Sequence, residues 1–296
     1  MTQSTADIWA QWLLHRRHGG DRERLEATLD QLYPVRDKVL SDAQLGDGDT
    51  LLDVGCGDGL IAFGALERRT TCRVVFVDIS QDLLDHAASL ARQMQLAARC
   101  EFLCASAENL STVQDHSVDA VTTRSVLIYV PRKQRAIREF HRVLKPGGRL
   151  SVFEPINRFG EPQPAHMFWG FDATPVMEIA AKIKTVYQRL QPLDTDPMMN
   201  FDERDLITYV EEAGFREVHL DLEANIKPLS DAQGWKMTWE SFLRTAANPK
   251  IPMLEEAMAQ ALTDDEAARF AAHMRLLVEH QVGTYRFAVA YLSAKK

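Results

Sequence analysis

The feature that most constrains the fold is a regular alternation of short apolar runs and amphipathic stretches between residues 50 and 153. Runs rich in β-branched residues give way to stretches in which apolar side chains recur every three to four positions. This pattern predicts strands at residues 50–54, 73–77, 101–104, 118–123 and 149–153. It predicts helices at residues 58–68, 80–97 and 132–144. Strands that alternate with helices form a parallel sheet covered on both faces, so we predict an α/β, doubly wound fold.

The remaining sequence divides into regions around this core. Residues 1–45 carry helical apolar stripes and predict a helical N-terminal extension, and residues 46–156 hold the alternating core. Residues 157–200 are broken by prolines and then predict a helix at 174–190, so we expect an insertion that acts as a lid. We expect residues 201–296 to form the C-terminal part of the core, with a helical insertion. Their elements are helices at 202–213, 234–246 and 263–279, and strands at 215–222 and 284–292.

The charge balance and cysteine usage exclude several classes of protein. The chain has 34 Lys and Arg against 42 Asp and Glu, a net charge of −8, so nucleic acid is not the expected partner. No apolar run approaches the ~20 residues of a membrane-spanning helix, and the first residues lack a signal-peptide pattern. None of the 4 cysteines forms a C-x-x-C pair, so we expect no metal site and a cytoplasmic protein with reduced thiols.

A glycine-rich turn follows the first predicted strand of the core. It reads Asp53-Val-Gly55-Cys56-Gly57-Asp-Gly59 and precedes a predicted helix. Glycines allow close backbone approach to a ligand, and the helix start offers free N–H groups. A dinucleotide fingerprint would need glycine at position 60, where leucine stands. The turn therefore fits an amino-acid tail and a ribose better than a pyrophosphate.

Polar residues also follow the next three strands. Asp78 ends the second strand, where a carboxylate can accept hydrogen bonds from ribose hydroxyls, and Ile79 beside it can lie against a purine. Ser106 and Ala107 follow the third strand, and Arg124 follows the fourth. Because parallel strands end at one edge of a sheet, we expect these residues to share one site.

The ordered set of motifs resembles the class I S-adenosylmethionine-dependent methyltransferases, in particular the small-molecule branch of ubiquinone/menaquinone-biosynthesis-like enzymes. The resemblance covers residues 50–155 and rests on LLDVGCGDG, VVFVDIS, CASAENL, VDAVTTRSVLIYV and HRVLKPGGRLSVFEP. It implies a seven-stranded Rossmann-like sheet that ends in a reversed hairpin. It also implies S-adenosyl-L-methionine as methyl donor and a small molecule as acceptor.

The resemblance assigns roles to individual residues. Asp53, Gly55, Cys56 and Gly57 would surround the methionine part of the donor, and Asp78 would hold its ribose. The remaining donor-site residues are Ile79, Ser106 and Ala107 around the adenine, and Arg124 near the methionine carboxylate or the acceptor. Two positions depart from the family pattern, since many relatives have an acid at Ser106 and a small polar residue at Arg124.

Three side chains are candidates for catalysis, namely Arg124, Glu154 just past the fifth strand and His166 in an aromatic loop. That loop also holds Met167, Phe168, Trp169 and Phe171, so we expect residues 158–190 to close over the donor and supply most acceptor contacts. Metal is not needed for methyl transfer from a sulfonium.

Alternatives remain at this stage. A nucleic-acid methyltransferase has the same core, and a nicotinamide-dependent oxidoreductase has a similar sheet. The sequence leaves open the acceptor, the atom methylated (O, N, C or S) and the oligomeric state.

Overall fold

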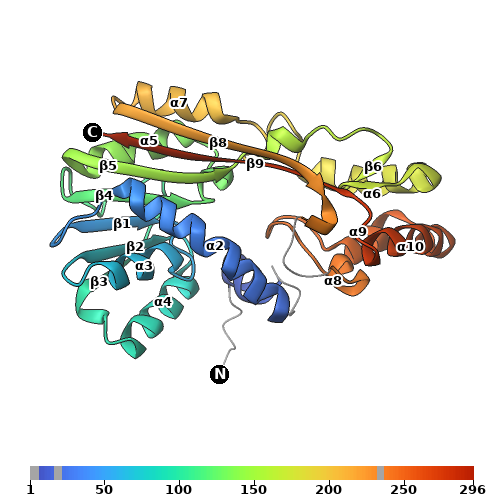
Figure 1. Cartoon of the computed structure of the whole chain (residues 1–296), viewed down its shortest axis with the longest axis horizontal. Coiled ribbons are helices and arrows are strands. Elements are labelled where there is room, and N and C mark those ends of the chain that lie inside the picture. Colours follow the sequence, from blue (N-terminus) through green and yellow to red (C-terminus); the bar gives the residue numbers. More distant parts are fainter. Residues whose placement is uncertain (1–6, 17–21, 232–236) are drawn as a thin grey trace.

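A computed structural model describes residues 7–16, 22–231 and 237–296. Seven strands of these described residues form one mixed sheet in the order β3-β2-β1-β4-β5-β9-β8 (Figure 1). The first five are parallel, and β9 lies antiparallel between β5 and β8. The predicted α/β, seven-stranded sheet with a reversed final hairpin is therefore confirmed. The strands are β1 (Thr50–Val54), β2 (Arg73–Asp78), β3 (Cys100–Cys104), β4 (Val118–Arg124), β5 (Leu144–Pro155), β8 (Arg216–Pro228) and β9 (Thr284–Lys295).

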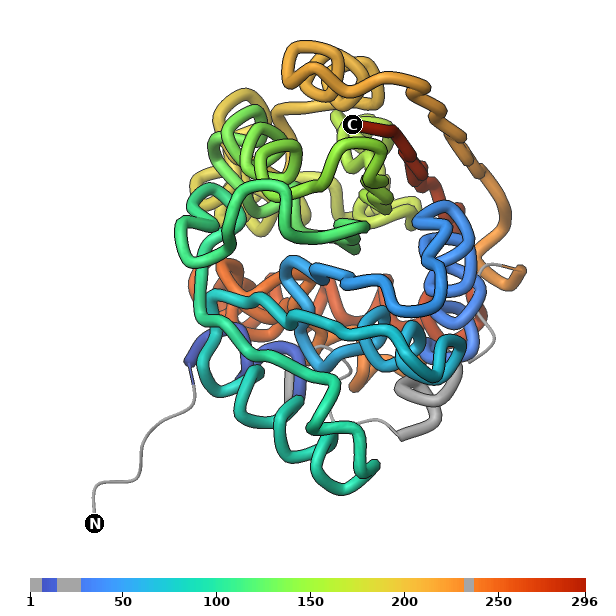
Figure 2. The backbone as a smooth tube through the Cα atoms, turned by 90° about the vertical axis from the view of Figure 1, so that its left-hand side faces the viewer, coloured from blue at the N-terminus to red at the C-terminus, as the bar shows by residue number. Residues whose placement is uncertain are grey.

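Helices cover both faces of the sheet. One face packs against α2 (Arg22–Ala43), α3 (Leu60–Arg68) and α4 (Gln81–Gln93). The other face packs against α5 (Lys133–Val143) and α7 (Glu203–Glu212). Figure 2 shows α2, in blue, beside the two C-terminal strands, and Lys38 of α2 forms an ion pair with Asp221 of β8. The two layers bury nearly all of β1, β2 and β4, including polar residues such as Asp53, Thr122 and Thr123.

Several predicted boundaries were close, and others were displaced. Ser80 is the N-cap of α4 and accepts a hydrogen bond from the Leu83 amide, as its position predicts. The helix ends at Gln93 rather than near residue 97, because Gln95 takes a left-handed backbone conformation (φ +60°). The last two strands run to Pro228 and Lys295, well beyond the predicted ends at 222 and 292. Part of the helix predicted at 234–246 lies outside the described residues, and the described part contains α8 (Trp239–Leu243).

The N-terminal extension contains a short helix, α1 (Ile8–Gln11), that continues into one irregular turn, η1 (Trp12–Arg16), before α2. Asp7 caps α1 by accepting hydrogen bonds from the amides of Trp9 and Ala10. The Asp7 amide in turn donates to the Asp82 carboxylate at the start of α4 (2.7 Å). The extension is therefore anchored on the core next to the carboxyl ends of the strands.

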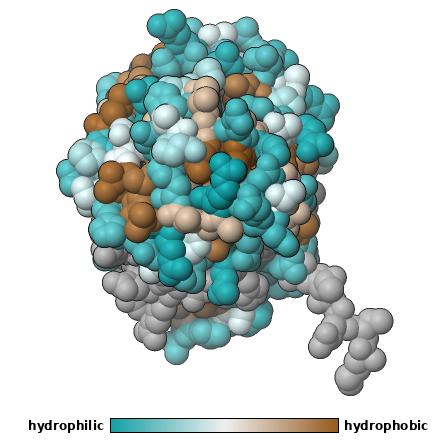
Figure 3. All heavy atoms as spheres, turned by 90° about the vertical axis from the view of Figure 1, so that its right-hand side faces the viewer, coloured by the Kyte–Doolittle hydropathy of each residue, from teal (hydrophilic) through white to brown (hydrophobic). Residues whose placement is uncertain are grey.

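A helical unit lies beside the sheet, at the right of Figure 1. It combines segments that come after β5 with segments that lie between β8 and β9, and it has its own core around Phe168, Phe171 and Phe270. Its surface in Figure 3 is mainly hydrophilic with separate apolar patches. Its elements are β6 (Met167–Phe168), β7 (Phe171–Asp172), α6 (Met177–Leu190), α8, α9 (Leu254–Ala261) and α10 (Asp264–Glu279). Short 3-10 turns are η2 (Ala97–Arg99), η3 (Leu127–Tyr129), η4 (Asn157–Gly160), η5 (Thr174–Val176) and η6 (Leu229–Asp231).

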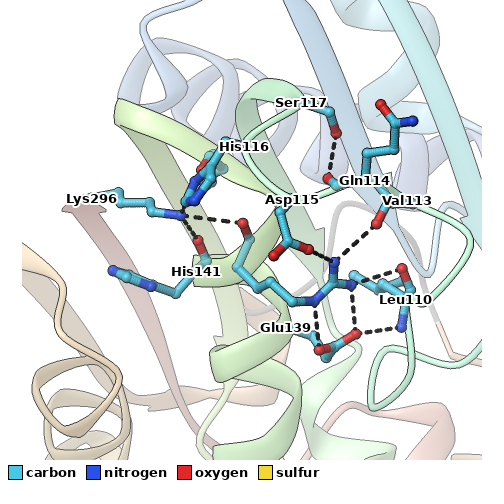
Figure 4. Close-up of polar contacts among 11 residues, drawn as sticks. Leu110, Val113, Gln114, Asp115, His116, Ser117, Glu139, His141 and Lys296 are labelled. Atoms are coloured by element: carbon cyan, nitrogen blue, oxygen red, sulfur yellow. Dashed lines mark hydrogen bonds and ion pairs between the residues drawn. The ribbon is translucent and has the colours of Figure 1, made fainter.

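Polar side chains form a hydrogen-bond network beside the amino ends of β4 and β5 (Figure 4). The Arg142 guanidinium donates to the carboxylates of Glu139 and Asp115 and to the carbonyls of Leu110 and Val113. The Lys296 ammonium donates to the carbonyls at the C-terminal end of α5 and contacts the His116 ring. These contacts satisfy carbonyls that a helix end leaves without partners.

Candidate functional site

A cavity of about 850 Å³ opens at the carboxyl ends of the parallel strands. Its walls come from the ends of β1, β2, β4 and β5, from the segment that follows β3 and from the start of β9. The N-terminal extension, residues 245–247 and Lys250 also line it. This is the edge where open α/β sheets bind ligands, and the volume lies within the ~300–1,000 Å³ typical of ligand sites.

The glycine-rich turn lies in the wall of this cavity. Gly55 and Gly57 both line it, with φ angles of +67° and +57°. A Cβ on Gly55 would lie 2.3 Å from Cγ2 of Val126, and a Cβ on Gly57 would lie 3.2 Å from Cδ2 of Leu13. Both positions thus need glycine for the backbone conformation, and the first also needs it for space.

Asp78 is 7% exposed and lines the same cavity. Its carboxylate accepts hydrogen bonds from the amides of Gly57 and Ser80, both at 2.9 Å. Burial raises the pKa of this carboxyl, and the backbone hydrogen bonds oppose the rise. Asp78 therefore joins the glycine turn to the start of α4, and each oxygen still has a free lone pair for a ligand.

The residues predicted around the adenine also line the cavity. Ile79 is 52% exposed and lines the cavity, so a face of its side chain is available to a ligand. Ser106 and Ala107 form the adjacent wall with Glu108. The Ser106 hydroxyl accepts from the Glu108 amide (3.2 Å), and the Glu108 carboxylate is paired with Arg132.

Asp53 and Cys56 are not among the residues that line the cavity, although the resemblance placed them around the methionine part. Asp53 is buried under the sheet surface, where one carboxylate oxygen accepts from the Thr122 hydroxyl (2.8 Å) and the other has no hydrogen-bond partner in the described ranges 7–16, 22–231 and 237–296. Burial raises its pKa to about 7, opposed by the Thr122 hydrogen bond and by the charge of Arg124. Cys56 is also buried, with a raised thiol pKa, so it fills space below the turn.

Arg124 ends β4 and lines the middle of the cavity, half-buried. Within the part of the chain that the structure describes, its guanidinium forms no hydrogen bond or ion pair. The next residue, Ser125, has a left-handed backbone conformation (φ +56°). A strained residue beside a cation with spare donors is typical of a ligand-binding turn.

Glu154 does not face the cavity, which corrects its place among the catalytic candidates. It is fully buried, and its carboxylate accepts hydrogen bonds from the amides of Val126, Leu127 and Ile128 (2.8–3.2 Å). It thereby fixes the turn that follows Ser125. Burial raises its pKa to about 7 against the effect of these three hydrogen bonds. In the structure Glu154 therefore contacts the turn that forms part of the cavity wall and not the cavity itself.

The segment 157–200, which we expected to act as a lid, reaches the cavity through Asn157 and Met198 near its two ends. No residue between 158 and 190 lines the cavity, and His166 is exposed outside it. Phe168 and Phe171 are buried in the core of the helical unit, and Trp169 packs on Tyr187 and Phe242. The aromatic loop is apolar because it builds that second core. A single loop sequence cannot distinguish the two outcomes, since both require burial.

The roof of the cavity comes from two other segments, which the sequence did not reveal as parts of the site. Trp9, Trp12 and Leu13 reach over it from the N-terminal extension. The Trp12 indole N–H donates to the Ala246 carbonyl (3.0 Å), in a segment whose residues 245–247 and Lys250 complete the lining. Two tryptophans at helical spacing near the start of the chain were the available signal, because such side chains need a partner surface.

The wall beyond Arg124 is held by Lys133. Its buried ammonium donates to the carbonyls of Val130 (3.1 Å) and Pro197 (2.8 Å). Val130 and Met198, next to Pro197, both line the cavity. Burial lowers the Lys133 pKa to about 8, opposed by the charge of Glu154. Asn157 also holds this loop, because its side-chain amide donates a hydrogen bond to the Met198 carbonyl (3.2 Å).

Among the described residues, no group of three or more His, Cys, Asp or Glu side chains is arranged to hold a metal ion. Across the same ranges, no helix has both the length and the apolar character needed to span a membrane.

Comparisons with known proteins agree with this geometry. Residues 52–152 match the family described as "Methyltransferase domain". The chain is 33% identical over 196 residues to the ubiquinone/menaquinone biosynthesis C-methyltransferase UbiE of Paracoccus denitrificans, covering 64% of this chain and 75% of the relative. It is 30% identical over 175 residues to the mitochondrial 2-methoxy-6-polyprenyl-1,4-benzoquinol methylase of Caenorhabditis elegans, covering 57% and 59%.

Solved structures show the same fold. A putative sarcosine dimethylglycine methyltransferase from Galdieria sulphuraria aligns with a TM-score of 0.55 at 15% identity, over 98% of both chains.

Proposed function

Because the chain belongs to the class I S-adenosylmethionine-dependent small-molecule methyltransferases, we propose that its cavity binds donor and acceptor side by side along the sheet edge. The reaction is transfer of a methyl group from S-adenosyl-L-methionine to a small-molecule acceptor. Residues 46–156 form the donor-binding core in this proposal, with residues 1–45, 157–200 and 201–296 as additions to it.

The observation that carries the assignment is the joint position of Gly57 and Asp78. A turn open to close approach and a buried carboxylate with free lone pairs lie in one wall, joined by a hydrogen bond of 2.9 Å. These groups fit an amino-acid tail and a ribose diol. Ile79, Ser106 and Ala107 would then flank the adenine, and Gly55 would face the methionine part.

The chain's own contribution is orientation and exclusion of water. The donor supplies a methyl group on a sulfonium, which is already reactive toward nucleophiles. The roof of Trp9, Trp12 and Leu13 covers the glycine turn. Glu154 and Lys133 hold the turn and the loop that form the acceptor wall. Alignment of two reactants in a dry site accounts for much of the rate that such enzymes gain.

Nucleic acid is not the acceptor in this proposal, since the chain has a net charge of −8 and the cavity is roofed. We place the reaction in the cytoplasm, supported by the four cysteines, which are free thiols in the structure.

Calorimetric titration with S-adenosylhomocysteine tests the donor site through Asp78→Asn. The variant keeps the shape of the side chain and loses its charge, so we expect affinity to fall by at least about tenfold, the value of one charge-assisted hydrogen bond. Asp78→Ala is less suitable, because it would free the amides of both Gly57 and Ser80, whereas asparagine keeps one acceptor oxygen for one of them. Asp119→Asn, at the amino end of β4 beside Lys145, is the matched control and should bind normally. Equal affinities in the two variants would remove Asp78 from the site.

A further inference from the structure

The order of strands divides the cavity into a donor part and an acceptor part. Asp78 and Ser106 follow β2 and β3, Gly55 follows β1, and Arg124 ends β4. Pro155 and Tyr285 come from β5 and β9, farther along the same sheet. With the ribose at Asp78 and the methionine part at Gly55, the acceptor must lie beyond Arg124, toward β5 and β9.

Aromatic rings dominate this second part. Tyr129 follows β4 and packs edge-on against Trp9 of the roof, with ring centroids 4.9 Å apart. Tyr285 lies at the start of β9, against the Phe287 ring (4.7 Å). The cavity is lined by four aromatic side chains, each of which contacts a neighbour, and by apolar Ile128 and Met198. Rigid rings of this kind bind a flat, apolar ligand with little loss of conformational entropy.

The charged residues of the cavity favour an anionic ligand. Its acidic residues are Asp78, which accepts from two backbone amides and is assigned to the donor's ribose, and Glu108, which is paired with Arg132. Its basic residues are Arg124 and, near the mouth, the exposed Lys250. In the ranges that the structure describes, neither forms an ion pair, although Arg124 lies near enough to lower the pKa of Asp53. A half-buried guanidinium with spare donors favours an anion, most of all a carboxylate.

We propose that the acceptor is a planar aromatic molecule that carries an anionic group, with the ring between Tyr129 and Tyr285 and the anion on Arg124. The proposal rests on the donor assignment above, because it uses the part of the cavity that the donor leaves. The cavity must hold both reactants, which favours an acceptor of a few rings. An acceptor anion beside the sulfonium is also stabilised by the donor's own charge.

Two probes that differ in one carboxylate test this proposal, namely 1-hydroxy-2-naphthoate and 1-naphthol. Each is titrated into protein saturated with S-adenosylhomocysteine. We expect the naphthoate to bind at least about tenfold more tightly, and Arg124→Met to reduce that preference to about twofold or less. Arg158→Met, a nearby exposed arginine outside the lining, is the matched control and should keep the preference.

The outcomes separate the two proposals. Failure of the wild-type protein to bind S-adenosylhomocysteine would contradict the donor site itself. Donor binding with no preference for the naphthoate, or with no binding of either probe, would overturn the acceptor class alone. Loss of S-adenosylhomocysteine affinity in Arg124→Met with the probe preference intact would assign Arg124 to the donor and also overturn it.

Discussion

Polar side chains at the two ends of the parallel strands differ in whether they have partners within the protein. At the amino end, Arg142 and Lys296 use their donors on carboxylates and carbonyls, and the polar groups there satisfy one another. At the carboxyl end, Arg124 has no such partners among the residues that the structure describes, and Gly57 and Ser125 take left-handed conformations beside a cavity. The difference shows where the fold keeps binding capacity and where it uses polar groups for stability.

We expect the largest effect on donor binding when valine replaces a left-handed glycine, and the two ends of the strands should respond differently. Gly57→Val should abolish donor binding, by more than about 100-fold, because a β-branched side chain would enter the cavity at a left-handed position. The matched variant is Gly147→Val at the amino end, where the glycine has a φ of +82° and an added Cβ would meet open space. It should lose stability and keep the affinity for S-adenosylhomocysteine measured by calorimetry. Similar affinities in both folded variants would contradict the assignment of the glycine turn.

The second effect concerns the buried carboxyl behind the cavity. The Glu154 pKa is raised to about 7 from an ordinary value of 4.5, so the folded state binds the proton more tightly than the unfolded chain. Its contribution to stability is complete below pH 4.5 and is lost as pH rises through 7, on the order of 3 kcal/mol in all.

Urea unfolding from pH 4.5 to 8 measures this contribution. Glu154→Gln should flatten the decline in the free energy of unfolding, leaving the slope due to Asp53, whose pKa is also raised to about 7. An unchanged slope in the variant would mean that Glu154 titrates normally.

A third prediction separates the helical unit from the cavity. Trp169→Ala should lower the free energy of unfolding by about 2 kcal/mol, less than for a fully buried tryptophan, because the side chain is half-buried on Tyr187 and Phe242. Affinity for S-adenosylhomocysteine and for the naphthoate probe should not change. Weaker probe binding in a variant of normal stability would return the aromatic loop to the site.

The smallest effect is expected at the amino end. Lys296→Met keeps much of the side-chain volume but removes the ammonium that contacts the end of α5, so stability should fall by about 1 kcal/mol. Thermal unfolding measures the loss, and calorimetry with S-adenosylhomocysteine should show unchanged affinity. A change in donor affinity would show that the two ends are coupled.

The helices and strands of the core were predicted well, because short sequence patterns within each element determine where it begins and ends. The alternating period located β1 to the residue, and Ser80 capped α4 as its type and position require. Gly57, Asp78 and Ser106 met at one edge because parallel strands end together. The roof could not be inferred in the same way. Trp12 meets Ala246 across 234 positions, and no periodicity within either segment specifies the other.

That contact has a consequence for the order in which the site comes into existence during synthesis. The glycine turn and Asp78 leave the ribosome well before Ala246 and Tyr285, which lie 246 − 78 = 168 and 285 − 78 = 207 positions after Asp78. β9, which carries Tyr285, must also insert between β5 and β8 before the sheet is complete. A partly made chain that lacks β9 therefore has the glycine turn and Asp78 without a closed cavity, so we expect acceptor binding to be deferred until β9 has been made and folded.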